Sequence, residues 1–118
     1  MNEAQPLVLD VKSRQGISVI ELSGEINSFA EPFLEEAFGR AEQFPGHAIL
    51  LDFSQVEYIN STGIALIVNM LRRSQQIGRK LMACGLSSHY QEIFKITRLS
   101  DFIAIYPDVD RATAEYQV

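Results

Sequence analysis

Short apolar runs alternate with longer amphipathic stretches throughout this chain, and that alternation constrains its fold more than any other feature. The apolar runs have the length and composition of β-strands, and they lie at residues 7–11, 17–22, 48–51, 81–84 and 103–106. The amphipathic stretches carry apolar residues at helical spacing, and they lie at residues 32–41, 61–76, 87–94 and 107–114. The expected order of elements is therefore β-β-α-β-α-β-α-β-α.

The connections between these runs predict how the strands pair. A turn at residues 13–16 joins the first two runs, which favours an antiparallel hairpin. The later strands are separated by helices, an arrangement typical of right-handed parallel crossovers. We therefore predict an α/β fold, with residues 1–118 forming one small domain. Its sheet is expected to be mixed and mostly parallel, with about five strands and about four helices.

The composition excludes several classes of function. A net charge of −5 argues against binding along a nucleic-acid backbone, because that requires a basic face. No apolar run reaches the roughly 20 residues that span a membrane. The first ten residues lack the basic and apolar regions of a secretory signal. We therefore expect a cytoplasmic protein that neither binds nucleic acid nor inserts directly into a membrane. The single cysteine, Cys84, lies in an apolar run, which favours a buried, reduced thiol over a reactive one.

The sequence gives little support for catalysis. Ser61, Thr62 and Gly63 resemble half of a nucleophile elbow, but Ile59 stands where the first glycine of that motif belongs. No acid that could orient a catalytic histidine is evident. There is no phosphate-binding loop, no dinucleotide fingerprint and no His or Cys cluster with metal-ligand spacing. We predict a protein that is not an enzyme and has no catalytic residue, cofactor or metal, with a hydrolase built on Ser61 as the less favoured alternative.

Polar loops follow three of the predicted strands, at residues 24–28, 58–63 and 85–88, and each contains a glycine and a hydroxyl. In sheets of this class, ligands bind beyond the carboxyl ends of parallel strands, where such loops gather. Two interpretations of the loops stay open. They can be helix caps and turns, which favour the same residue types, or they can form a binding site together.

The helix expected at residues 61–76 has two apolar stripes. Residues 64, 67, 68 and 71 form one stripe that can face the sheet. Leu66 and Met70 form a second stripe, which a helix with one buried face does not need. Either a neighbouring helix covers the second stripe, or the stripe is an apolar patch for a partner protein.

Four segments of the chain resemble one known family. Residues 20–27 resemble the family's strand that ends in Gly-Glu-hydrophobic-Asp, and residues 51–64 resemble its signature, an apolar strand and linker followed by Asp-Ser-Ser/Thr-Gly-Leu. Residues 81–85 and 94–99 resemble its last strand-helix unit. Over nearly its whole length, the chain thus resembles the STAS domain family, and within it the bacterial anti-sigma-factor antagonists.

The resemblance implies a function by partner switching. In the antagonist branch, an anti-sigma factor with serine kinase activity phosphorylates the serine after the signature Asp, and a PP2C-type phosphatase removes the phosphate. The unphosphorylated antagonist captures the kinase and frees the sigma factor. By position, Ser61 is the expected phosphorylation site, with Thr62 the less favoured one. The residues expected to contact the partner are Glu25, Asn27, Asn60, Ser61, Thr62, Gly63, Leu66, Met70 and Ser87.

The chain departs from the family pattern at two positions, because Asn27 and Asn60 stand where the family usually has Asp. Asparagine keeps the shape and the capping ability of Asp and loses its charge. Two consequences stay open. Ser61 can still be phosphorylated, more slowly or by a kinase with different contacts. The protein can instead be a non-switching STAS scaffold, or a subunit of a stress-signalling or lipid- or anion-transport complex.

Overall fold

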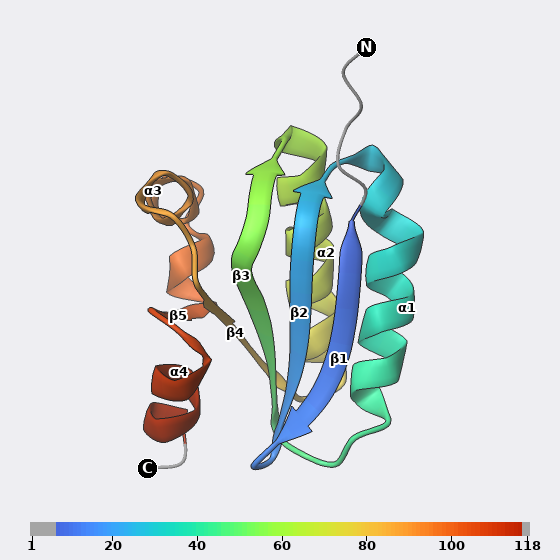
Figure 1. Cartoon of the computed structure of the whole chain (residues 1–118). Helices are drawn as coiled ribbons and strands as arrows, with labels where there is room; N and C mark the ends of the chain where they lie inside the picture. Colours follow the sequence, from blue (N-terminus) through green and yellow to red (C-terminus); the bar gives the residue numbers. More distant parts are fainter. Residues whose placement is uncertain (1–6, 117–118) are drawn as a thin grey trace.

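The structure is a computed structural model, and it describes residues 7–116. The first six residues, part of the segment predicted to lack a secretory signal, lie outside the described range. The elements alternate as predicted, with two short 3-10 helices, η1 and η2, in addition (Figure 1). They are β1 (Val8–Arg14), β2 (Ile17–Ile26), η1 (Ser28–Ala30), α1 (Glu31–Glu42), β3 (Ala48–Ile59), α2 (Ser61–Gln76), β4 (Lys80–Cys84), α3 (Ser88–Ile96), η2 (Leu99–Asp101), β5 (Ala104–Tyr106) and α4 (Val109–Tyr116).

The five strands form one mixed sheet in the order β1-β2-β3-β4-β5. β1 and β2 are antiparallel, and the other three pairs are parallel. The β1–β2 turn places Gln15 and Gly16 at positive φ, which is the geometry of a tight two-residue hairpin loop. The predicted α/β class, the hairpin and the mixed sheet are confirmed.

Two strands are longer than predicted. β2 continues past residue 22 to Ile26, and β3 continues past residue 51 to Ile59. The segment between the predicted strand at residues 48–51 and the predicted helix at residues 61–76, which we expected to be a connector, is therefore mostly strand, and that expectation was wrong. The extended parts pair with each other, with register shifts between Glu21 and Ser23 and between Gly24 and Glu25. β4, in contrast, pairs with β3 only as far as Asp52.

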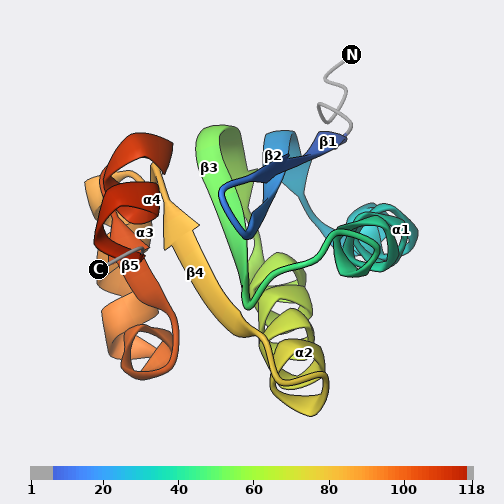
Figure 2. The same cartoon turned by 90° about the horizontal axis from the view of Figure 1, so that it is seen from below.

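Each face of the sheet has its own core. Ile49 and Leu51 of β3 belong to the larger cluster of buried residues, to which α1, α2 and α3 contribute. Ala48 and Leu50 belong to a smaller cluster, which includes Ala112 of α4. Because successive side chains of a strand point to opposite faces, the two clusters lie on opposite sides of the sheet. Figure 2 shows α1 and α2 together on one side.

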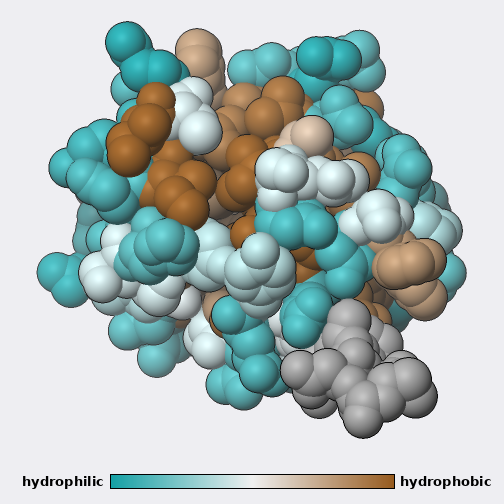
Figure 3. Space-filling model, turned by 90° about the horizontal axis from the view of Figure 1, so that it is seen from above, coloured by the Kyte–Doolittle hydropathy of each residue, from teal (hydrophilic) through white to brown (hydrophobic). Residues whose placement is uncertain are grey.

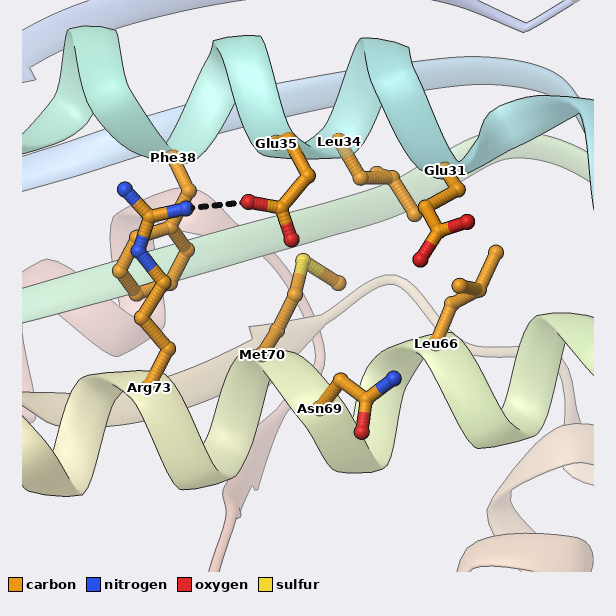
Figure 4. A pocket seen from close by; sticks show the side chains of 8 residues that line it. All are labelled: Glu31, Leu34, Glu35, Phe38, Leu66, Asn69, Met70 and Arg73. Atoms are coloured by element: carbon orange, nitrogen blue, oxygen red, sulfur yellow. Dashed lines mark hydrogen bonds and ion pairs between the residues drawn. The ribbon is translucent and has the colours of Figure 1, made fainter.

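The second apolar stripe of α2 is covered by α1. Leu66 and Met70 are buried, and together with Leu34 and Phe38 of α1 they line a cavity of about 20 Å³ (Figure 4). The cavity is too small for a ligand larger than about one water molecule. The interpretation that a neighbouring helix covers this stripe is confirmed. An exposed partner patch at Leu66 and Met70 is wrong, because α1 packs against both side chains.

None of the helices within residues 7–116 is long and apolar enough to cross a membrane.

Candidate functional site

The candidate site lies where two strands end and two helical segments begin. The carboxyl ends of β2 and β3 stand side by side at one edge of the sheet, next to the start of the η1–α1 segment and of α2 (Figure 1). Residues 60–63 lie at this edge, directly after β3. The first two polar segments therefore lie at one edge of the sheet as predicted, but residues 24–26 and 58–59 belong to β2 and β3 and are not loops.

Asn60 caps α2 and fixes the residues that follow it. Its backbone is extended, and its side-chain oxygen accepts a hydrogen bond from the Gly63 N–H at 2.8 Å. Its carbonyl accepts the Ile64 N–H at 3.0 Å. Ser61 and Thr62 occupy the first two positions of the helix, and both are exposed. The cap thus holds two hydroxyls at the positive end of a 16-residue helix.

Gly63 lets the start of α2 approach the end of β2 very closely. A Cβ atom at Gly63 would lie 2.2 Å from the Ile26 carbonyl oxygen and 2.8 Å from a methyl group of Ile59. The same Ile26 carbonyl accepts a hydrogen bond from the Asn60 N–H at 3.2 Å. The strand and the helix are therefore joined rigidly on either side of Ser61.

Asn27 caps η1 in the same way as Asn60 caps α2. Its side-chain oxygen accepts the Phe29 N–H at 2.9 Å. Both asparagines act as caps through the oxygen atom that an aspartate would also offer. Glu25, at the end of β2, is partly buried and lies next to Tyr58 of β3 in the strand register.

Tyr90 is a site residue that our reading of the sequence missed. Its hydroxyl accepts a hydrogen bond from the Ile59 N–H at 2.8 Å and lies 3.4 Å from the Ile59 carbonyl, to which it can donate. Ser87 caps α3 by accepting the Tyr90 N–H at 3.3 Å, so Ser87 is linked to the site through Tyr90. The sequence shows Tyr90 only as an apolar position of a helix, since the two contacting residues are 31 positions apart.

The surroundings of Ser61 suit a hydroxyl that receives a chemical group from another protein better than a hydroxyl that acts as the nucleophile of an enzyme. Within residues 7–116, no side chain forms a hydrogen bond with the Ser61 hydroxyl. The described residues also include no group of three or more His, Cys, Asp or Glu side chains that could hold a metal ion. Among residues 7–116, the site therefore presents the Ser61 hydroxyl on a rigid support and without a side-chain hydrogen-bond partner.

Comparison with known proteins identifies the family. A family model for the STAS domain matches residues 8–112. The chain belongs to the STAS domain family. The predicted family is thus confirmed over most of the chain.

This STAS domain has relatives with named roles. It is 31% identical over 98 residues to the anti-sigma-B factor antagonist of Listeria monocytogenes serovar 1/2a, covering 82% of this chain and 86% of the relative. Its fold matches an anti-sigma factor antagonist from Mycobacterium paratuberculosis with a TM-score of 0.81, 24% identity and 96% coverage of each chain. It also matches the Bacillus cell fate determinant SpoIIAA in its phosphorylated form, with a TM-score of 0.70, 16% identity, and coverage of 92% of this chain and 99% of that one.

Proposed function

We propose that this STAS protein is an anti-sigma-factor antagonist that binds an anti-sigma factor with serine kinase activity and is switched off by phosphorylation of Ser61. The observation that carries the proposal is the exposed Ser61 hydroxyl, free of side-chain hydrogen bonds within residues 7–116 and held at the first position of α2. The proposal is supported by the Listeria relative, which is named an anti-sigma-B factor antagonist. The Bacillus structure of the same fold, in a phosphorylated form, agrees with it.

The chemistry is a phosphoryl transfer in which this protein is the substrate. The Ser61 oxygen attacks the γ-phosphorus of ATP, the bond to the leaving ADP oxygen breaks, and the hydroxyl proton passes to a base of the kinase. A PP2C-type phosphatase returns Ser61 to its hydroxyl form by hydrolysing the phosphate ester with water. This division of roles agrees with a site that positions the Ser61 hydroxyl without a side-chain hydrogen-bond partner among residues 7–116.

The phosphate is expected to act at the interface and not on the fold. It adds about −1.5 to −2 charges, which the N–H groups and dipole at the start of α2 can stabilise. At the kinase surface, the same group meets nucleotide phosphates and a contact shaped for a hydroxyl. Losing an interfacial hydrogen bond and burying unpaired charge costs several kcal/mol, which is roughly a hundredfold or more in affinity.

A second candidate function is a constitutive STAS scaffold or complex subunit. The observation that favours it is the pair of neutral caps, Asn27 and Asn60, where the family usually has Asp. If a carboxylate at either position helps to orient the serine for the kinase, this chain lacks that help and binds partners without switching.

Incubation with ATP, Mg²⁺ and purified anti-sigma factors, that of the Listeria sigma-B system first, tests the proposal. Intact-mass spectrometry should show a gain of one phosphate, and peptide mapping should place it on Ser61. Ser61→Ala should abolish the gain, while Thr62→Ala should keep it. Tight binding of an anti-sigma factor without any phosphate on Ser61 would instead favour the scaffold, and neither binding nor phosphate would overturn the antagonist role.

A further inference from the structure

We propose that Tyr90 is a positioning residue for the phosphorylation of Ser61. Its hydroxyl holds the backbone of Ile59, which lies shortly before Ser61, and so keeps the Ser61 hydroxyl where the kinase can use it. Tyr90 acts on the rate of phosphoryl transfer and not on the binding of the kinase. The inference rests on the proposed function and deepens it, because it adds a residue of α3 to a site built from β3 and α2.

The start of α3 is attached to β3 at two places, both beyond Asp52, the last residue of β3 that pairs with β4. A Cβ atom at Gly85 would lie 2.8 Å from the backbone nitrogen of Ser54, so the loop after β4 passes directly against β3. Further along β3, the Ile59 N–H donates to the Tyr90 hydroxyl at 2.8 Å, and this hydroxyl can donate to the Ile59 carbonyl at 3.4 Å. α3 thus takes the place of β4 beside the last part of β3.

The side chain that carries this hydroxyl is itself fixed. Ser87 caps α3 and accepts the Tyr90 N–H at 3.3 Å. Phe94 follows Tyr90 by about one helical turn, is fully buried, and packs edge-on against Phe53 of β3 with ring centres 6.1 Å apart. A side chain whose own position is locked by packing and hydrogen bonds can hold its neighbour in one orientation.

The hydrogen bonds between Tyr90 and Ile59 lie where water has little access. Figure 3 views the molecule from the end at which β3 leads into α2, and it shows hydrophobic side chains gathered on the side of α3. Tyr90 is 8% exposed and Ile59 is 5% exposed. Removal of the Tyr90 hydroxyl therefore leaves the Ile59 N–H without an acceptor, because a buried group regains no hydrogen bond from bulk water.

The backbone before Ser61 is held from both sides. On the side of β2, the Asn60 N–H donates to the Ile26 carbonyl at 3.2 Å. On the side of α3, the Tyr90 hydroxyl holds Ile59. The Ser61 hydroxyl has no side-chain hydrogen bond within residues 7–116, so its position depends on the backbone that carries it. A misplacement of about 1 Å can slow a transfer reaction by up to about a hundredfold, so a looser backbone should slow phosphorylation.

Single-turnover phosphorylation of Ser61, using the kinase that modifies Ser61 in the mass-spectrometric assay, tests the inference. The kinase is in excess and its concentration is varied. Tyr90→Phe should lower the maximal rate constant roughly fivefold and leave the half-saturating kinase concentration unchanged, because the contacts with the kinase persist while fewer molecules hold the hydroxyl in line. In the unbound protein, the Asn60 amide should exchange hydrogen faster in Tyr90→Phe than in the wild type, because loosening at Ile59 reaches the cap.

Two variants serve as matched controls. Tyr106→Phe removes a tyrosine hydroxyl that forms no hydrogen bond with the described residues. Thr113→Val removes a hydroxyl from a buried residue of α4, where it donates to the Val109 carbonyl at 2.8 Å, so it costs a hydrogen bond in another part of the molecule. Both variants should keep the wild-type rate constant.

The possible outcomes separate this inference from the proposed function. If Tyr90→Phe is phosphorylated on Ser61 at the wild-type rate, or changes only the half-saturating concentration, the positioning role is overturned and the switch stands. If Thr113→Val is slowed as much as Tyr90→Phe, the slowing follows from lower stability, and the positioning role is overturned as well. If no kinase modifies the wild-type protein, both proposals fail. Thermal unfolding of each variant sets an assay temperature at which all of them are folded.

Discussion

At the scale of single residues, the Tyr90 hydroxyl forms hydrogen bonds with a part of β3 that is no longer paired with β4. β4 pairs with β3 only up to Asp52, so the N–H and C=O groups that β3 turns toward α3 need other partners further along. At Ile59, directly before the Asn60 cap, both groups lie within hydrogen-bond distance of the Tyr90 hydroxyl. A contact from α3 therefore fixes the approach to Ser61.

We expect Tyr90→Phe to lower the free energy of unfolding by about 1–2 kcal/mol, because the buried Ile59 N–H loses its acceptor. Urea unfolding measures the total, and hydrogen exchange of the Ile59 amide should show a specific loss of protection. Tyr106→Phe is the control, since the Tyr106 hydroxyl forms no hydrogen bond with the described residues. Equal effects of the two variants would contradict this role of Tyr90.

Asn60 should make the start of α2 tolerant of a phosphate. In Asn60→Asp the cap persists and a carboxylate lies next to Ser61, so it repels a phosphate there by about 1 kcal/mol. Unphosphorylated Asn60→Asp should be slightly more stable than the wild type, by roughly 0.3–1 kcal/mol, because a negative charge favours a helix start. Phosphorylation of Ser61 should therefore raise Tm in the wild type more than in Asn60→Asp. A larger rise in the variant would contradict the electrostatic argument.

At the scale of elements, Arg73 of α2 forms ion pairs and a ring contact with α1. Its guanidinium donates to Glu35 at 2.7 Å and to Glu42, and it lies 4.7 Å from the centre of the Phe38 ring (Figure 4). The ion pairs are partly exposed and individually weak, but together with the ring contact they hold the two helices at one distance. Arg73 lines the same small cavity between the two helices as Leu66 and Met70.

Arg73→Ala should destabilise the protein by about 1–2 kcal/mol, and Arg73→Lys should recover only part of that loss because an ammonium group cannot form the same planar fork. Arg72→Ala is the neighbouring control, because Arg72 is exposed and has no ion pair within residues 7–116. Urea unfolding should separate the two positions clearly. An equal, small effect of both variants would show that the contacts of Arg73 with α1 contribute nothing to the free energy of unfolding.

The order of elements could be predicted from the sequence, because apolar periodicity differs between strands and helices. The lengths of β2 and β3 could not. Beyond Asp52, β3 carries exposed polar residues such as Ser54 and Gln55, which look like a connector even though the backbone stays paired to β2. The caps at Asn27 and Asn60 follow local rules and could be predicted, whereas the cover of Met70 by α1 depends on packing between elements distant in sequence.

At the scale of the whole molecule, the smaller core between the sheet and α4 contains a protected thiol. Cys84 is fully buried there, as predicted. Burial, and to a smaller extent the negative charge of the Asp52 carboxylate, together raise the pKa of the Cys84 thiol from 9.0 to about 12. The thiol therefore stays protonated in the folded state at pH values where the unfolded chain loses that proton.

This difference predicts how stability changes in alkali. Below pH 9 both states hold the proton, and between about pH 9 and about 12 only the folded state does. The free energy of unfolding should therefore fall by up to about 1.4 kcal/mol per pH unit in that window from this group alone. Urea unfolding at several pH values should show a shallower decline for Cys84→Ala than for the wild type. Parallel curves would contradict the shift.

The contact between Gly63 and the Ile26 carbonyl has a consequence for reading related sequences. The glycine is required because a methyl group would collide with the backbone of β2, whether or not a kinase ever meets the neighbouring serine. A glycine at this position is therefore diagnostic of how the helix joins the sheet. The hydroxyl of Ser61 is exposed and forms no side-chain hydrogen bond within residues 7–116, so we expect its exchange to cost the fold little. Ser61 is therefore the position at which a regulated protein and a permanent binder can diverge.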